Sequence, residues 1–166
     1  MEKNRGFTLI ELMVTIGILA IIATMAAPSF GNFIVEQKLR SAVSEIKLSI
    51  DEAKSQAATL KAPVALCLNK TALIDNVDAD QCARTAPIVG YTSMSSDEQL
   101  EVQKSRVILA KIDPKVAVAA GSATTIIINE VGSFNAGASF NLCNANKQKN
   151  ITVTRLGIVT EASGTC

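Results

Sequence analysis

Hydrophobic positions divide the chain into an apolar run, an amphipathic stretch and a region of short alternating segments. Residues 7–27 carry one charge, Glu11, and are long enough to cross a bilayer as a helix, which needs about 20 residues. Beyond this run, hydrophobic residues recur at spacings of three and four, as on one face of a helix. This stripe consists of Leu39, Val43, Ile46, Ile50, Ala53, Ala57 and Leu60. The two patterns predict one helix from Phe7 to about Lys61, ended by Pro63.

Pro28 lies where the apolar run meets the amphipathic stretch, and we expect it to kink the helix without ending it. At 1.5 Å per residue the whole helix would be on the order of 80 Å long. A domain of this size cannot bury such a helix. Its first half must therefore lie in a membrane or among other helices, and only its second half can support a globular head.

The remainder of the chain is rich in β-branched residues and turn signals. Residues 69–87 are polar and are predicted to form a loop, and residues 132–137 a turn. We expect six or seven mostly antiparallel strands, packed on the second half of the long helix, in an α+β fold. The segments with strand patterns are residues 63–68, 106–112, 115–120, 124–131, 138–143 and 151–159.

Four cysteines and no histidine limit the chemistry of the chain. An even number of cysteines outside the cytoplasm favours disulfides, and four cysteines allow three pairings. We favour Cys67–Cys82 and Cys143–Cys166 because each closes a short loop, worth roughly 3 kcal/mol in the chain-entropy model. Without histidine, a zinc site and histidine-based catalytic triads are disfavoured, so we expect no enzyme, no metal and no cofactor.

Charge adds little to the choice of partner, because the formal net charge is +1. Lys3 and Arg5 precede the apolar run, which predicts a cytoplasmic N-terminus and a body on the other side of the membrane. Asp75, Asp78 and Asp80 lie close together, but their segment lacks the glycine and the final glutamate of a calcium-binding loop. We therefore interpret them as turn residues.

Glu11 is the least expected residue of the apolar run. A carboxylate costs roughly 2.5–3.5 kcal/mol at the centre of a membrane helix, and a simple anchor leaves this cost unexplained. A secretory signal peptide would have a shorter apolar core and a clear cleavage site. The segment Gly6-Phe7-Thr8-Leu9-Ile10-Glu11 resembles the cleavage junction of type IV prepilins and type II secretion pseudopilins. The resemblance implies that prepilin peptidase cuts between Gly6 and Phe7 and methylates the amino group of Phe7.

Later segments are similar to the GspH/FimT group of minor pilins and pseudopilins, in particular to the FimT or FimU type. The similar segments are Pro63–Cys67, Phe140–Cys143 and Ile151–Gly157, with Cys166 beyond them. The resemblance implies four parts in the chain. They are a leader (residues 1–6), a transmembrane and filament-core half of the helix (7–28), an amphipathic half (29–62) and a β-rich head (63–166).

The resemblance also implies a function in assembly. Glu11 would pair with the amino group of Phe7 in a neighbouring subunit and so set the register of the filament. The chain would be a minor pilin of a type IV pilus, in a priming or tip complex with other minor pilins and the major pilin. It would span the inner membrane once, with its head in the periplasm, and later reach the cell surface. A GspH-like pseudopilin of type II secretion is the alternative.

A DNA-binding minor pilin for natural transformation is the other alternative. Some FimT-like proteins bind DNA through a Gly-Arg-x-Arg tract, but the corresponding stretch here, Gly157–Thr160, contains no arginine. Lys147, Lys149 and Arg155 remain candidates for weak contacts with DNA. The chain has one tyrosine and no tryptophan to stack on bases, so we interpret these residues as part of a solvated basic face.

Overall fold

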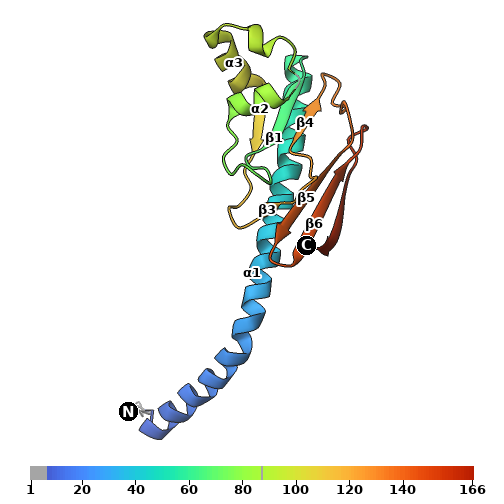
Figure 1. Cartoon of the computed structure of the whole chain (residues 1–166). Helices are drawn as coiled ribbons and strands as arrows, with labels where there is room; N and C mark the ends of the chain where they lie inside the picture. Colours follow the sequence, from blue (N-terminus) through green and yellow to red (C-terminus); the bar gives the residue numbers. More distant parts are fainter. Residues whose placement is uncertain (1–6, 87) are drawn as a thin grey trace, which may run out of the picture. The chain divides into compact units, whose positions relative to one another are not determined.

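The computed structural model describes residues 7–86 and 88–166, without the side chains of residues 25–29 (Figure 1). Gly6 and the rest of the predicted leader lie outside these residues. The chain divides into two compact units, with the boundary between Val35 and Glu36. Residues 36–166 are called the head below, and each unit is described by itself.

Helix α1 spans Leu9–Leu60, close to the predicted limits. The predicted stripe from Leu39 to Ala57 is buried in the head, and Ala42 joins it. The prediction was wrong for Leu60, which is 43% exposed, because α1 ends there and Lys61 takes a left-handed backbone conformation. The helix continues through position 28, and the kink at Pro28 stays a prediction.

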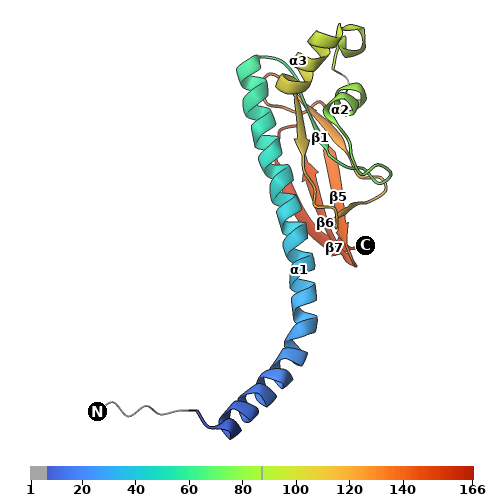
Figure 2. The same ribbon diagram turned by 90° about the vertical axis from the view of Figure 1, so that its left-hand side faces the viewer.

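Two sheets pack beside the C-terminal part of α1 (Figures 1 and 2). The first has β1 (Val64–Leu68) at its centre, with β2 (Val107–Ala110) parallel and β4 (Thr125–Ile128) antiparallel to it. The second is fully antiparallel, in the order β3-β5-β6-β7. Its strands are β3 (Ala117–Val118), β5 (Ala138–Asn144), β6 (Lys147–Val153) and β7 (Val159–Thr165). The expected α+β fold, with mostly antiparallel strands on the helix, is therefore confirmed.

The predicted strand over residues 151–159 was wrong. Its first part is the end of β6, and its last residue begins β7. Thr154 N–H donates to the carbonyl of Ile158 at 3.0 Å, and Gly157 has a φ of 82°, so the chain reverses between them. The sequence pattern did not reveal this reversal because hydrophobic residues recur on both sides of the turn and Leu156 lies within it.

Two helices lie at the end of the head where α1 ends (Figure 2). The predicted loop over residues 69–87 contains α2 (Ala79–Thr85), whose first turn is capped by the side chain of Asp78. Helix α3 (Ser96–Arg106) begins with a capping box of Ser95 and Glu98, and a short 3-10 helix (Tyr91–Ser93) precedes it. The Ser-x-x-Glu spacing was a readable signal for α3.

The core of the head lies between α1 and the sheets. Strand β1 is buried along its whole length, and Phe140, Leu142, Ile151 and Val153 point into the core from β5 and β6. A second, smaller cluster gathers around Tyr91 under α2 and α3. This packing leaves β7 uncovered, since every residue from Thr160 to Thr165 is exposed.

Candidate assembly segment and charged cluster

The first turn of α1 is closed by a reciprocal contact between Thr8 and Glu11. The carboxylate of Glu11 accepts hydrogen bonds from the backbone N–H of Thr8 at 3.0 Å and from its hydroxyl at 2.8 Å. The hydroxyl of Thr8 in turn accepts from the backbone N–H of Glu11 at 3.3 Å. This is a capping box, which satisfies N–H groups that otherwise have no helical partner. The capping box was not among the predictions from the sequence, although the Thr-x-x-Glu spacing is a known signal for it.

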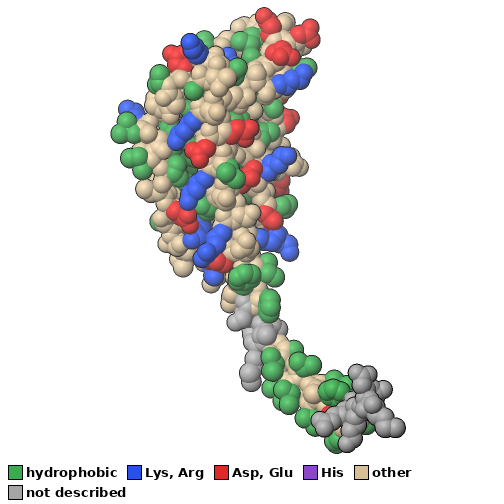
Figure 3. Space-filling model, turned by 180° about the vertical axis from the view of Figure 1, so that it is seen from behind, with side chains coloured by type: hydrophobic (Ala, Val, Ile, Leu, Met, Phe, Trp, Pro, Cys, Tyr) green, Lys and Arg blue, Asp and Glu red, His purple; other side chains and the backbone are tan. Residues whose placement is uncertain are grey.

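Apolar side chains are exposed along the N-terminal part of α1 (Figure 3). Phe7, the predicted methylation site, is 80% exposed. Every other large hydrophobic side chain described between Leu9 and Ile34 is at least 51% exposed. Contiguous apolar surface of this extent marks a protein or membrane contact. Among the described residues, no helix combines the length and hydropathy that crossing a membrane requires.

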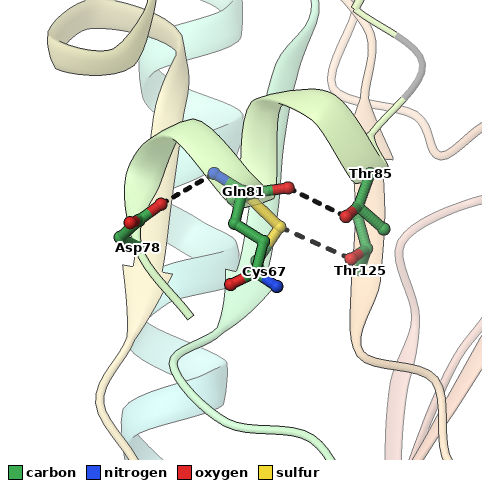
Figure 4. Close-up of a disulfide and its surroundings, with 6 residues drawn as sticks. Cys67, Asp78, Gln81, Thr85 and Thr125 are labelled. Carbon is green, nitrogen blue, oxygen red and sulfur yellow. Dashed lines mark hydrogen bonds between the residues drawn. A yellow bond between two sulfur atoms is a disulfide. The ribbon is translucent and has the colours of Figure 1, made fainter. Parts of the chain in front are cut away.

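The first disulfide joins Cys67 in β1 to Cys82 in α2, with 5.9 Å between their Cα atoms. Figure 4 shows how short polar contacts surround it. Asp78 accepts from the backbone N–H of Gln81 at 2.7 Å, and the Thr85 hydroxyl donates to the carbonyl of Gln81. These bonds shape the two-turn helix that carries Cys82, and the disulfide then holds that helix against the sheet.

The second disulfide joins Cys143 in β5 to Cys166 beyond β7, with Cα atoms 6.1 Å apart. Both disulfides are the pairs that loop length favours. Since β6 lies between β5 and β7, this bond crosses the end of the β5–β6 hairpin. It holds the far end of the exposed strand β7 in place.

Two of the DNA-contact candidates, Lys147 and Lys149, lie in a charged cluster between α1, β6 and β7. Lys149 is 9% exposed, and its ammonium donates to Glu161 at 3.0 Å and to the Ser163 hydroxyl at 2.8 Å. Lys147 reaches Glu36 at 3.4 Å. Lys149 is therefore paired and almost buried, which leaves little of it for a phosphate backbone.

Two further cations complete this charged cluster from α1. Lys47 pairs with Glu161 at 3.0 Å, and Arg40 donates through Nε to Glu36 at 3.2 Å. The hydrogen bond from Lys149 holds the pKa of Glu161 below its usual range, and the bond from Arg40 does the same for the pKa of Glu36. Both carboxylates are thus kept ionised among the cations.

Arg155, the third DNA-contact candidate, lies apart from this cluster in the turn beyond the opposite end of β6. Its backbone carbonyl accepts from the N–H of Phe134. The structure therefore does not bring the three candidates together.

The three aspartates of the predicted loop have separate structural contacts. Asp78 caps α2, and Asp75 lies 3.7 Å from the ammonium of Lys70. Asp80 accepts from Arg84 at 2.7 Å and from the buried Tyr91 hydroxyl at 2.7 Å. The bond from Arg84 is the main reason why the pKa of Asp80 is lowered. Within the part of the chain that the structure describes, no three carboxylate or cysteine groups gather as a metal site would require.

A helix with an exposed apolar start, continued into a small head with mostly antiparallel sheets, defines the pilin-like class of subunits. A family profile described as type II transport protein GspH matches residues 42–157, and one described as the prokaryotic N-terminal methylation motif matches residues 1–27. The chain belongs to the GspH family.

Curated relatives are similar over part of the chain. A probable minor fimbrial protein of Dichelobacter nodosus is 33% identical over 82 residues, 49% of this chain and 45% of that protein. The type IV major fimbrial protein FimA of the same organism is 33% identical over 89 residues, 54% of this chain and 42% of that protein. Prepilin peptidase-dependent protein D of Escherichia coli is 56% identical over 34 residues, 20% of this chain and 23% of that protein. The chain thus spans less than half the length of these relatives. No solved structure matches.

Proposed function

We propose that this protein is a minor pilin that assembles into a type IV pilus after cleavage by prepilin peptidase. The observation that carries the proposal is the exposed apolar side chains described on Phe7 and along α1 as far as Ile34, next to a prepilin-like junction. Membership of the GspH family and the similarity to minor fimbrial proteins support it. We assign the protein a structural role in the filament and no catalytic activity.

In this proposal the four parts of the chain act in sequence. The leader, residues 1–6, is removed at Gly6, and the amino group of Phe7 is methylated. Residues 7–28 hold the subunit in the inner membrane, with the head in the periplasm, until they move into the filament core. Residues 29–62 connect that core to the β-rich part of the head, residues 63–166, which contacts other minor pilins and the major pilin in a priming or tip complex.

Glu11 would change partners during this process. In the single chain its carboxylate caps α1 by accepting from Thr8. In the filament the carboxylate would accept from the amino group of Phe7 on a neighbouring subunit. An unpaired charge among apolar helices costs several kcal/mol, so only the register that pairs Glu11 would be stable.

Substitution of Glu11 tests the assembly proposal. We expect Glu11→Ala to be cleaved by prepilin peptidase but to be lost from sheared pili on immunoblots, because its helix lacks the charge that sets register. Glu45→Ala, which removes a carboxylate from the head half of α1, is the control and should be incorporated. Normal incorporation of Glu11→Ala would refute the role of Glu11.

Substitution of Gly6 tests the cleavage step separately. We expect Gly6→Val to leave only the uncleaved precursor on an immunoblot, because the bulkier side chain blocks the peptidase at the scissile bond. Asn4→Ala, two residues upstream, should be processed normally. Mature protein from Gly6→Val in wild-type amounts would contradict the predicted junction.

A pseudopilin of a type II secretion system is the second candidate, and the description of the matching family favours it. A strain that lacks the protein distinguishes the two functions. Loss of surface pili with normal export of folded proteins supports the minor pilin. Loss of export with normal piliation supports the pseudopilin.

A further inference from the structure

Strand β7 lies at the exposed edge of its sheet, and a groove separates it from α1. One face of β6 points toward α1, since Ile151 and Val153 on that face are fully buried and Lys149 on the same face lies 3.7 Å from Glu36 of α1. The neighbouring residues on β7, Glu161 and Ser163, stand opposite Ile151 and Lys149 but stay exposed. Helix α1 therefore covers β6 but does not cover β7. The groove has a volume of about 370 Å³ and is lined by Arg40, Val43, Ser44, Lys47, Lys149 and Glu161.

The groove carries more positive than negative charge. Four cations of the charged cluster, Arg40, Lys47, Lys147 and Lys149, share the two carboxylates of Glu36 and Glu161. Arg40 bonds Glu36 through Nε, and no described residue bonds its two terminal amino groups. Its side chain is 66% exposed. A guanidinium in this state can receive a carboxylate in a bidentate pair.

The outer edge of β7 offers backbone hydrogen bonds next to this groove. The bond from Thr154 N–H to the Ile158 carbonyl shows which positions of β6 and β7 face each other. Hydrogen-bonded pairs alternate in an antiparallel ladder, so the N–H and C=O groups of Glu161 and Ser163 point away from β6. Among the described strands, β7 pairs with β6 alone. The Cys143–Cys166 disulfide holds this edge in place for a partner.

We propose that β7 and the groove beside α1 bind an extended acidic segment of a partner subunit. The segment adds a strand to β7, and its alternate side chains place carboxylates near Arg40 and Lys47. Backbone pairing supplies affinity, and the cations supply specificity. The inference rests on the proposed function only for the source of the segment, a neighbouring subunit of the filament.

A polypeptide fits this surface better than a nucleic acid does. A nucleic-acid strand has no regular series of amide N–H and C=O groups to pair with β7.

Binding of a synthetic peptide tests the proposal. The probe is a fluorescent peptide of seven residues, the length of β7, in which threonine and glutamate alternate, added to the full chain in detergent. We expect saturable binding that Arg40→Ala weakens about tenfold, since a charge-assisted pair is lost. Lys104→Ala is the matched control, because the side chain of Lys104, on α3, is 62% exposed, close to the 66% of Arg40, and its loss should leave binding unchanged. Unchanged binding by Arg40→Ala would overturn the proposal.

Two further probes separate strand addition from simple charge attraction. The same peptide is N-methylated on its odd or on its even amides, and we expect one of the two versions to lose binding, because methylation removes the donors that face β7. Equal binding by both versions would refute strand addition. A single-stranded DNA of equal charge should bind more weakly, and tighter binding of the DNA would refute the acidic segment. None of these outcomes affects the pilus assay for Glu11, so the two proposals can fail separately.

Discussion

Thr8 and Glu11 show how one residue pair can serve two states of the protein. In the single chain the hydroxyl and the carboxylate close the first turn of α1 by exchanging hydrogen bonds. The same carboxylate is the one that the proposed filament needs for register. The cap lowers the cost of keeping an ionised group in an apolar segment until a neighbouring subunit supplies a cation.

Replacement of Thr8 should loosen the start of α1 without affecting the head. We expect Thr8→Ala to cost about 1 kcal/mol locally, which is about a fivefold loss of amide protection at residues 9–12 in the uncleaved chain. Hydrogen exchange followed by NMR in detergent measures this. The control Thr24→Ala removes a hydroxyl that bonds the Ile21 carbonyl within the helix, and it should leave the first turn protected. Equal protection in Thr8→Ala would exclude the capping role.

At the scale of elements, the stability of α2 comes from its disulfide and its cap, because the helix itself is short. A helix of seven residues is too short to be stable alone, and Asp78 and Cys82 supply a cap and a covalent link to β1. Under it, Tyr91 is 1% exposed and donates to Asp80, and burial is the main reason why the pKa of Tyr91 is raised. The small cluster is thus joined to the main core through Cys67.

Removal of this disulfide should destabilise the whole head. We expect Cys67→Ser with Cys82→Ser to lower the free energy of unfolding by about 3 kcal/mol, the value for a loop of this length. Denaturant titration of the full chain in detergent measures it. For comparison, Cys143→Ser with Cys166→Ser should lose a similar free energy by the same model and should also raise hydrogen exchange in β7, because this bond holds a strand at the edge of a sheet. A loss below about 1 kcal/mol for the first pair would contradict the assigned role.

At the scale of the whole molecule, ion pairs between distant segments join α1 to the strands and to the loop between β2 and β3. Lys38 donates to Asp113 at 2.8 Å, and Lys47 and Lys149 meet at Glu161. The bond from Lys38 is the main cause of the lowered pKa of Asp113, as the bond from Lys149 is for Glu161. A carboxylate with a lowered pKa stabilises the folded state above its unfolded pKa, and this contribution disappears as the pH falls through the folded pKa.

Stability should therefore be nearly constant between pH 6 and 8, since the chain has no histidine, and should fall in acid below about pH 4.5. Denaturant titrations of the full chain at pH 7 and pH 3 measure the loss. Glu161→Gln should reduce the difference between the free energies of unfolding at pH 7 and pH 3, because the variant has no carboxylate at this position to take up a proton on unfolding. Glu130→Gln, which removes an exposed carboxylate from the turn after β4, is the control. An unaltered acid loss in Glu161→Gln would refute the linkage.

The long helix and most strands were predictable because their signals are local. The spacing of Leu39 to Ala57 marks the buried face of α1, and alternation marks β5 through Phe140 and Leu142. Helices α2 and α3 were not predicted because they have few hydrophobic residues and depend on caps and on the disulfide. The end of β6 was misplaced because Leu156, though hydrophobic, lies in a turn and is 84% exposed.

By itself, the sequence determined the apolar start, the prepilin-like junction, the amphipathic stripe and the favoured cysteine pairs, since each depends on neighbouring residues or on loop length. Only the tertiary structure decided that Lys147 and Lys149 join a charged cluster with Glu36 and Glu161, that Arg155 lies apart from it, and that β7 stays exposed. The contacts of this cluster with α1 join segments more than 100 residues apart, as in the pairs of Lys147 with Glu36 and of Lys47 with Glu161, which are 111 and 114 positions apart. No local pattern encodes such a contact, because it arises only when the sheet packs on the helix.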